Sequence, residues 1–316
     1  MAGGWPRFAA SLYHRPMQLR ALLTIACACL AAVPSTRAAD CKSTVSGNLH
    51  IHPLASKIFN NTRSIRVLLP PDYYAEKSSS KRYPVLYMLD GQNLFDACLS
   101  DVSHVEWQVD ETVYRLIREQ AIPEMIVVGI DHAGVQRAYE FLPYRDSFNP
   151  DMEDPAGTHF PDFLVNEVMP LVNGQYRTLT GHGNTALGGS SYGGVATLYA
   201  LLARPQTFGY GLIESPSIWV GMGQLIRDTS PLVGMPRKVV IAFGSEEVSH
   251  GAAEKQVQGF FATVSANFKA AGYDDSNFRY VYEQGAKHTE SAWAKRLPDA
   301  LKFLFADWKP EQAGQQ

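Results

Sequence analysis

Short hydrophobic runs alternate along most of this chain with longer segments whose hydrophobic positions recur every three or four residues. The runs are typical of strands buried on both faces of a parallel sheet, and the longer period is typical of helices with one buried side. Strands are predicted over residues 64–69, 83–89, 125–130, 186–189, 210–213, 238–243 and 278–282. Helices are predicted over residues 110–119, 160–171, 192–203, 252–271 and 291–305. This alternation predicts an α/β fold, with a mainly parallel central sheet and helices on both faces.

The first forty residues follow a different pattern. Three arginines precede an apolar run over residues 21–33, and small residues follow that run. The run is too short to span a bilayer comfortably, and its flanks are typical of a secretory signal. We therefore predict a removable signal peptide over residues 1–39, no stable membrane insertion afterwards, and a periplasmic or secreted protein. With no internal repeat or linker, residues 40–316 are expected to form a single domain.

Composition and charge exclude several classes of function. The chain has 28 Lys and Arg against 31 Asp and Glu, and it has no basic stripe interleaved with aromatic residues. Nucleic acid is therefore not an expected partner. Removal of the signal leaves Cys41 and Cys98, which either form one disulfide in an oxidising compartment or stay unpaired. No cysteine pair at metal-ligand spacing remains.

A serine flanked by glycines joins a predicted strand to a predicted helix. Residues 189–193 read Gly-Ser-Ser-Tyr-Gly, the pattern of a nucleophile elbow, in which a sharp turn lifts the central serine off the sheet. The start of the following helix favours developing negative charge. The motif and its context predict Ser191 as the nucleophile of a serine hydrolase with the α/β-hydrolase fold.

A serine hydroxyl needs an oriented base to react, and later loops supply candidates. In this fold the chain order is serine, then a carboxylate, then histidine, on loops that follow late strands. Glu246 and Glu247 follow the strand that ends at residue 243, and His288 follows the last predicted strand. Adjacent side chains point in different directions, so only one of these glutamates is expected to face His288. The acyl-transfer chemistry expected of these residues implies no metal and no organic cofactor.

Two backbone N–H groups are expected to hold the oxyanion of the tetrahedral intermediate. One belongs to Tyr192, the residue after the nucleophile. The other is placed in the loop after the early strand, where Gly91 permits a close backbone approach and Gln92 offers an N–H group. Only the short stretch over residues 214–237 stands where many hydrolases insert a cap, so no large cap domain and an open cleft are predicted.

Several of these segments together resemble the putative esterase family of the α/β-hydrolase superfamily. The resemblance covers residues 65–304 and is carried by residues 69–73 (LPPDY), 85–92 (VLYMLDGQ), 188–194 and 215–219 (SPSIW). The family groups siderophore trilactone esterases, feruloyl and acetylxylan esterases, S-formylglutathione hydrolases and mycolyltransferases. The resemblance implies a serine esterase acting on a small-molecule or glycan ester, closest to the branch with periplasmic siderophore esterases.

The resemblance also assigns roles to individual residues. It selects Glu247 as the triad carboxylate, and it places Arg137 and Trp219 at the substrate, Arg137 against an anionic or catecholate group. The family often has a second tryptophan where Val220 stands here. An acyltransferase or a serine peptidase would use the same triad. A non-catalytic binding protein of this fold normally lacks a triad member, whereas all three residue types are present here.

Overall fold

The computed structural model describes residues 41–101, 104–146, 154–229, 236–248 and 251–310. The predicted signal peptide lies outside these stretches. The chain divides into two units, residues 1–42 and 43–316, and the second contains all helices and strands of the described residues. No helix in these stretches is long and apolar enough to cross a membrane.

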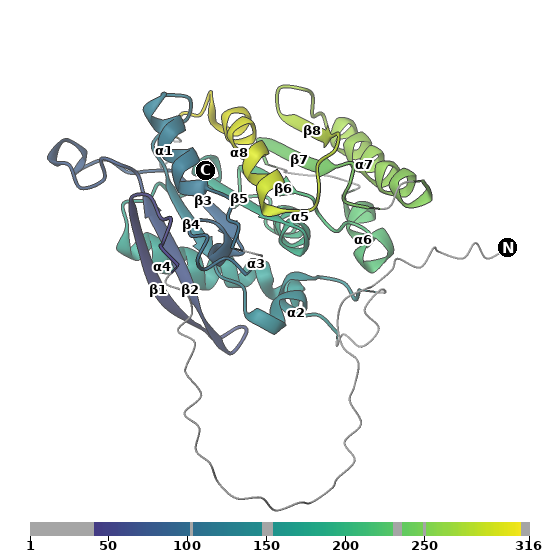
Figure 1. The fold of residues 1–316 in the computed structure, drawn as a ribbon, viewed down its shortest axis with the longest axis horizontal. Helices are drawn as coiled ribbons and strands as arrows, with labels where there is room; N and C mark the ends of the chain where they lie inside the picture. Colours follow the sequence, from purple (N-terminus) through teal and green to yellow (C-terminus); the bar gives the residue numbers. More distant parts are fainter. Residues whose placement is uncertain (1–40, 102–103, 147–153, 230–235, 249–250, 311–316) are drawn as a thin grey trace, which may run out of the picture. The chain divides into compact units, whose positions relative to one another are not determined.

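Within the described residues, eight strands form one sheet in the order β1-β2-β4-β3-β5-β6-β7-β8 (Figure 1). The strands are β1 (Asn48–Ser56), β2 (Asn61–Leu69), β3 (Val85–Leu89), β4 (Ile126–Ile130), β5 (Thr185–Ser190), β6 (Tyr210–Glu214), β7 (Lys238–Gly244) and β8 (Phe278–Glu283). The pairs β1–β2 and β2–β4 are antiparallel, and the other pairs are parallel. The predicted α/β fold with a mainly parallel sheet is confirmed.

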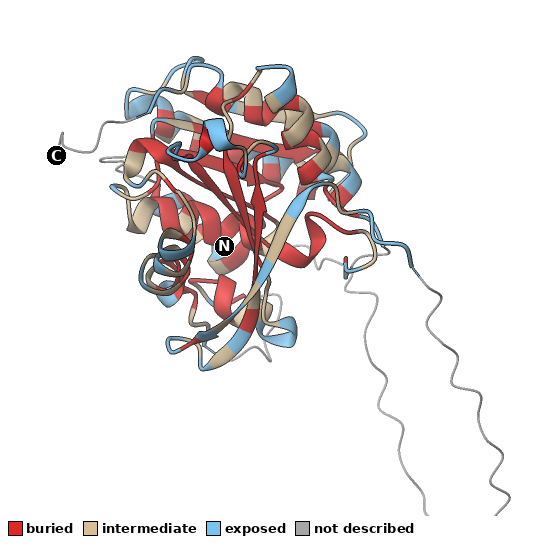
Figure 2. Ribbon diagram, turned by 90° about the vertical axis from the view of Figure 1, so that its left-hand side faces the viewer, coloured by how far each residue is buried: buried red, intermediate tan, exposed pale blue. Residues whose placement is uncertain are grey.

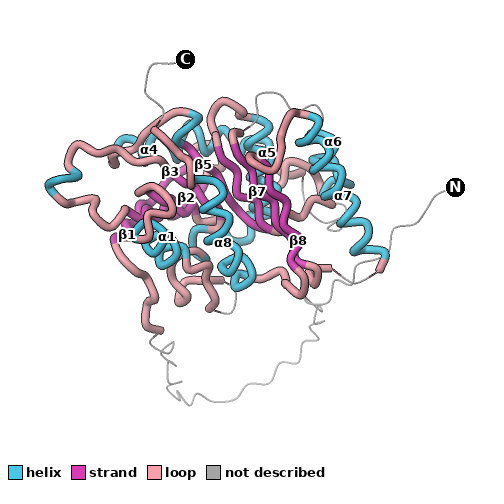
Figure 3. Tube along the Cα trace, turned by 90° about the horizontal axis from the view of Figure 1, so that it is seen from above, coloured by secondary structure: helices cyan, strands magenta, loops and turns pink. Residues whose placement is uncertain are grey.

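Helices cover both faces of this sheet. They are α1 (Val109–Arg118), α2 (Arg137–Phe141), α3 (Phe160–Phe163), α4 (Met169–Gln175), α5 (Tyr192–Ala203), α6 (Val220–Asp228), α7 (Ala252–Ala270) and α8 (Glu290–Phe305). Helices α1 and α8 contact each other on one face (Figure 3), and side chains of α3 to α7 pack on the other. Buried residues fill both layers around the strands (Figure 2).

The alternation of side chains along the strands explains why there are two core layers. In β3, Tyr87 and Leu89 join the core under α3 to α7, whereas Leu86 and Met88 join the core under α1 and α8. A parallel strand buried on both faces must be apolar at every position. All five residues of β3 are buried, so a nearly continuous apolar run was the correct signal for this strand.

Three elements escape the sequence pattern. Helix α2 is a short helix between β4 and α3, where the sequence predicts none. Strand β1 at the sheet edge is mostly exposed or half-buried and contains Pro53, so it lacks the apolar run that marks the central strands. Helix α6 is kinked at Gly221, Met222 and Gly223, whose positive φ angles are not helical, so its sequence lacks an uninterrupted helical period. Other predicted elements agree with the structure to within a few residues at their ends.

Both cysteines that would remain after signal removal are oxidised. Cys41 and Cys98 are each disulfide-bonded in the structure, so the unpaired thiols that the sequence left open are not observed. Disulfides persist in oxidising compartments and are rare in the reducing cytosol.

Candidate active site

The predicted nucleophile lies on a strained turn between β5 and α5. Ser191 has φ 57° and ψ −123°, a conformation that only surrounding structure can hold. Its backbone N–H donates to the carbonyl of Glu214 on the neighbouring strand, at 3.1 Å. A Cβ atom on Gly189 would lie 2.8 Å from the carbonyl oxygen of Gly193, so the turn closes only with glycine at this position.

Ser191 and His288 line one cleft of about 250 Å³ at the carboxyl ends of the strands. The other lining residues are Asp90, Asn93, Asp101, His132, Arg137, Ser190, Glu290 and Trp293. Parallel strands bring their carboxyl ends to one sheet edge, which explains how residues almost one hundred positions apart line one cleft. No hydrogen bond joins the side chains of Ser191 and His288 within the described part of the chain. Among the described residues, Trp219 does not line this cleft and instead packs, half-buried, against the core under α3 to α7.

Glu247, rather than Glu246, faces the histidine. Its Oε2 accepts a hydrogen bond from Nδ1 of His288 at 2.9 Å, and its side chain is fully buried. Its Oε1 accepts from the N–H of Gly244 and the hydroxyl of Ser215, both at 2.6 Å. Glu246 is exposed. Because a carboxylate only accepts, His288 carries its proton on Nδ1 and keeps Nε2 as an acceptor.

Trp293 supports this pair from α8. Its indole N–H donates to the hydroxyl of Ser215 at 2.8 Å. Its ring meets the His288 ring edge-on, with centroids 5.1 Å apart and an interplanar angle of 84°. Trp293 is buried, so it holds both the imidazole and the hydroxyl that orients Glu247.

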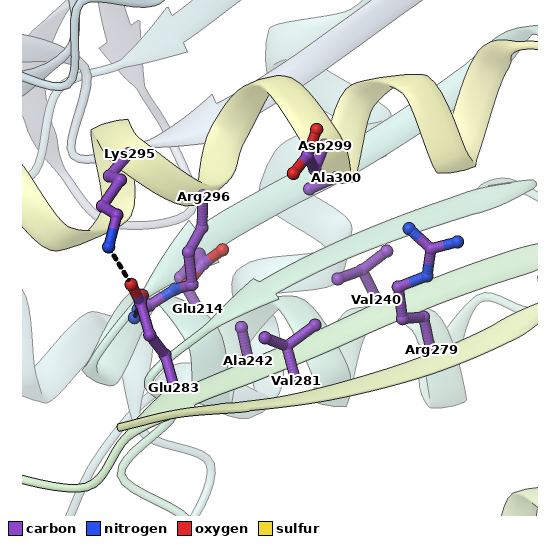
Figure 4. A pocket seen from close by; sticks show the side chains of 10 residues that line it. All are labelled: Glu214, Val240, Ala242, Arg279, Val281, Glu283, Lys295, Arg296, Asp299 and Ala300. Carbon is purple, nitrogen blue, oxygen red and sulfur yellow. Dashed lines mark hydrogen bonds and ion pairs between the residues drawn. The ribbon is translucent and has the colours of Figure 1, made fainter. Parts of the chain in front are cut away.

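A buried arginine lies behind the same carboxylate. Arg296 donates to Glu214 at 2.9 Å and to Glu283 at 3.1 Å, and its guanidinium is 4.0 Å from Oε1 of Glu247. Arg296, Glu214 and Glu283 line a separate cavity of about 270 Å³ between α8 and the strands β6 to β8 (Figure 4). The sequence pattern did not single out Trp293 or Arg296. The one available signal was the position of Arg296 on the buried side of the last helix.

The two predicted oxyanion donors are not themselves among the residues that line the cleft, but both adjoin residues that do: Tyr192 follows Ser191, and Gln92 precedes Asn93. Tyr192 is the first residue of α5, and its N–H has no backbone acceptor among the described residues. Gln92 lies in a 3-10 turn after β3, and its side chain bonds Asp101 and the N–H of His132. A Cβ atom on Gly91 would lie 2.7 Å from the backbone of β4. Glycine is therefore required for this turn to pack against the sheet.

Arg137 is a cleft residue and not a surface arginine. Its guanidinium forms a bidentate ion pair with Asp90 at 2.6 and 2.8 Å and donates to the carbonyl of Ser190 at 3.4 Å. It also lies 5.6 Å from the ring centroid of Tyr192. Asp90 therefore already neutralises much of the positive charge of Arg137, which the family resemblance placed against an anionic or catecholate group of the substrate. Of the guanidinium nitrogens, only Nη1 lacks an acceptor among the described residues.

A second imidazole in the cleft is already committed to other partners. Nε2 of His132 lies 2.9 Å from Oδ2 of Asp101, and Nδ1 accepts from the N–H of Gly134 at 2.9 Å. Neither nitrogen is then left to accept a proton from serine. Nε2 of His288, in contrast, has no such partner among the described residues.

Glu290 is a cleft residue that the sequence reasoning missed. It begins α8, two positions after His288, and is 5% exposed. Burial raises the pKa of its carboxyl. An acidic residue in the first turn of a helix is common for reasons of the helix dipole alone, so nothing in the sequence singled it out.

Replacing Glu290 with glutamine is expected to raise the melting temperature at neutral pH. The raised pKa means that the folded protein favours the protonated carboxyl, which stabilises the fold at low pH and is lost as the pH rises. The gain in Glu290→Gln should be ~1 kcal/mol, or about 2–4 °C, and should vanish below about pH 4. Thermal melts from below pH 4 to neutral pH measure this difference in melting temperature, and the exposed Glu246→Gln is the control. Equal melting temperatures of wild type and Glu290→Gln at every pH would contradict the expectation.

The comparisons with known proteins agree with this architecture. The family model described as Putative esterase matches residues 56–304. YbbA, an uncharacterised protein of Bacillus subtilis, is 24% identical over 268 residues, which is 83% of this chain and 97% of YbbA. The siderophore triacetylfusarinine C esterase of Aspergillus fumigatus is 29% identical over 162 residues, 49% of this chain and 51% of that enzyme. The crystal structure of the BES protein from Bacillus cereus has a TM-score of 0.65 at 22% identity, covering 82% of this chain and 95% of that one.

The matched region is most of the chain, so the chain belongs to the Putative esterase family. It is accordingly a carboxylic ester hydrolase of the α/β-hydrolase type. The structural likeness to the Bacillus cereus protein, at its low identity, bears on the fold alone.

Proposed function

We propose that this chain is an exported serine esterase that works through Ser191, His288 and Glu247. The observation that carries the proposal is the 2.9 Å hydrogen bond between buried Glu247 and His288, whose ring lines the same cleft as strained Ser191. Such a bond orients an imidazole with Nε2 free to accept a proton. The serine mechanism is typical of the family to which the chain belongs.

In the proposed reaction the Ser191 oxygen attacks the ester carbonyl while its proton passes to Nε2 of His288. The tetrahedral intermediate collapses to an acyl-enzyme, and His288 returns the proton to the leaving alcohol. Water, deprotonated by His288, then releases the acid and regenerates Ser191. Glu247 stays ionised and stabilises the imidazolium that forms twice in this cycle.

The oxyanion is assigned to the N–H groups of Tyr192 and Gln92. The Tyr192 N–H is supported by its lack of a backbone acceptor among the described residues and by its place at the start of α5. One such donor contributes about 3 kcal/mol to transition-state stabilisation. Arg137 is assigned a positioning role, because it joins Asp90, before the Gln92 turn, to the carbonyl before Ser191.

The substrate we propose is an ester that carries hydroxyl groups, such as a catechol siderophore lactone or a feruloylated or acetylated glycan. Carboxylates of Asp101 and Glu290 line the cleft beside Arg137, whose charge Asp90 balances. Carboxylates accept hydrogen bonds from hydroxyls and repel anionic groups. The siderophore triacetylfusarinine C esterase of Aspergillus fumigatus among the relatives supports the siderophore side of this class.

A matched ester series tests this preference. Wild-type kcat/KM is expected to be about tenfold higher for a 3,4-dihydroxybenzoyl ester than for its 3-carboxy analogue with the same leaving group, a difference of about 1.4 kcal/mol. The Glu290→Gln variant should narrow that ratio because it removes one repelling charge. A preference for the carboxylate ester would overturn the assignment of the substrate class while leaving esterase activity intact.

Export is proposed from two separate observations. Residues 1–39 carry the pattern of a signal peptide, and Cys41 and Cys98 are disulfide-bonded, a state that suits the periplasm or the outside of the cell.

Labelling with a fluorophosphonate probe tests the mechanism. The probe should modify one residue of the purified protein, and mass mapping should place it on Ser191. Hydrolysis of p-nitrophenyl esters without cleavage of peptide substrates would support an esterase over a peptidase. Transfer of the acyl group to a sugar or alcohol in preference to water would instead identify an acyltransferase. Label on another serine would overturn the proposed nucleophile.

A further inference from the structure

Three carboxylates gather away from the esterase cleft, where the chain enters α1. They belong to Glu106, Asp110 and Glu111, and one oxygen from each lies within 4.8 Å of the other two. Glu106 is 6% exposed and Asp110 is fully buried, while Glu111 is half-buried. The proposed reaction uses none of them.

No positively charged side chain among the described residues balances the charge of these three carboxylates. One oxygen of each carboxylate, Oε2 of Glu106, Oδ1 of Asp110 and Oε2 of Glu111, is buried with no hydrogen-bond donor outside the cluster among the described residues, and the carboxyl groups of Asp110 and Glu111 lie close enough to hydrogen-bond each other. No lysine, arginine or histidine in those residues forms an ion pair with any of the three. Burying an ionised carboxylate without a partner is costly, and burying three together adds their mutual repulsion.

The second oxygens of Glu106 and Asp110 are fixed by the segment before β1. The hydroxyl of Thr44 donates to Oε1 of Glu106 at 2.5 Å. The backbone N–H of Ser46 donates to Oδ2 of Asp110 at 2.5 Å. Each of these bonds occupies one oxygen of its carboxylate and leaves the other oxygen without a donor from outside the cluster. The carboxylates of Glu106 and Asp110 are therefore held in place by this segment.

We propose that Glu106, Asp110 and Glu111 form a structural calcium site that fastens residues 44–46 to the start of α1. A set of oxygen ligands alone suits a hard cation. Calcium–oxygen distances of about 2.3–2.6 Å allow two ligands to stand up to about 5 Å apart, whereas the shorter bonds of magnesium allow only about 4.2 Å. The three oxygens here lie within 4.8 Å of one another, inside the span that calcium allows. Water molecules would complete the coordination.

The site has a physical route to the rest of the protein through Trp107. Trp107 lies between Glu106 and Asp110 in the chain, and its backbone N–H donates to the backbone carbonyl of Asn93 at 3.0 Å. Its ring packs on that of Trp293, with centroids 5.4 Å apart. A bound ion would therefore hold the segment that supports both the turn after β3 and the tryptophan beside His288.

Terbium luminescence and thermal melts test the proposal on the purified full chain after treatment with a chelator. Terbium replaces calcium at oxygen sites and emits when a nearby tryptophan is excited, and Trp107 adjoins a ligand. We expect saturable emission that calcium displaces. We also expect the melting temperature to rise by about 5 °C in about 10 mM calcium, with a smaller rise in magnesium.

Two variants and a control make the result specific. Asp110→Asn and Glu111→Gln should each lose most of the terbium emission and the calcium-dependent rise in melting temperature. Glu119→Gln, an exposed carboxylate at the other end of α1, should keep both. The half-buried Glu111 provides a second variant if Asp110→Asn does not fold. Absence of both signals in the wild type, as expected if the carboxylates only share protons, would overturn the proposal, and so would equal binding by Glu111→Gln and Glu119→Gln.

Discussion

Replacing Ser191 with alanine is expected to lower kcat for p-nitrophenyl ester hydrolysis by about 10⁴- to 10⁶-fold. The substitution removes the oxygen that forms the acyl-enzyme, and no other hydroxyl is held on the turn between β5 and α5 in the same conformation. Some acceleration over water should remain from the oxyanion donors and substrate binding. KM should change little, because the missing interaction is covalent and belongs to the reaction step. Steady-state kinetics with active-site titration measure both parameters.

The neighbouring Ser190 provides the control for this prediction. It is a buried serine at the end of β5, and its hydroxyl precedes the turn by one residue. Ser190→Ala changes the same atoms in the same motif, and we expect it to keep kcat within about tenfold of the wild type. Equal loss in the two variants would mean that damage to the turn, and not loss of a nucleophile, explains the effect. Unchanged activity in Ser191→Ala would remove the serine mechanism altogether.

Much of the fold could be predicted because its central strands have no solvated face. Each residue of β4 is buried, so the strand could be recognised from its composition alone. Strand β1 could not be predicted in this way, because its nine backbone pairings with β2 are independent of side-chain type. Its place at the edge is decided by the partner strand and not by its own apolar positions.

The proposed triad could be placed from the sequence because each member follows a recognisable strand. The choice between Glu246 and Glu247 depended on the backbone conformation. Both residues follow the same strand, and only the turn after β7 decides which side chain points inward. The family resemblance selected Glu247, and the hydrogen bond to His288 agrees with that choice. The supporting contacts of Trp293 could not be found in this way, because they depend on how α8 lies against the sheet.

Arg137 shows a different limit of sequence reasoning. An arginine in a long loop has a reach of several ångströms, so its partner cannot be deduced from its position in the chain. The bidentate bond to Asp90 places the guanidinium against the loop after β3. Trp219 is a similar case, since its ring packs on the core and not into the cleft within the described part of the chain.

Replacing Glu247 with glutamine is expected to lower kcat by about 10²- to 10⁴-fold without unfolding the protein. The amide has almost the same shape as the carboxylate, so packing around the side chain is preserved. The charge that stabilises the imidazolium of His288 is lost, and Arg296 at 4.0 Å is left with one carboxylate fewer. Kinetics on p-nitrophenyl esters measure the loss, circular dichroism and thermal melts check the fold, and the exposed Glu246→Gln is the matched control.

The buried hydrogen bonds dictate which way the new amide must face. The hydroxyl of Ser215 already accepts from Trp293 and Arg296, so it can only donate to residue 247, and the N–H of Gly244 also only donates. Both donors require the amide oxygen, which turns the NH₂ group toward Nδ1 of His288. The imidazole must then carry its proton on Nε2, where it cannot accept the proton of Ser191. The rate of fluorophosphonate labelling should therefore fall together with kcat while KM stays near the wild-type value. A Glu247→Gln variant as active as Glu246→Gln would show that the carboxylate merely fills space.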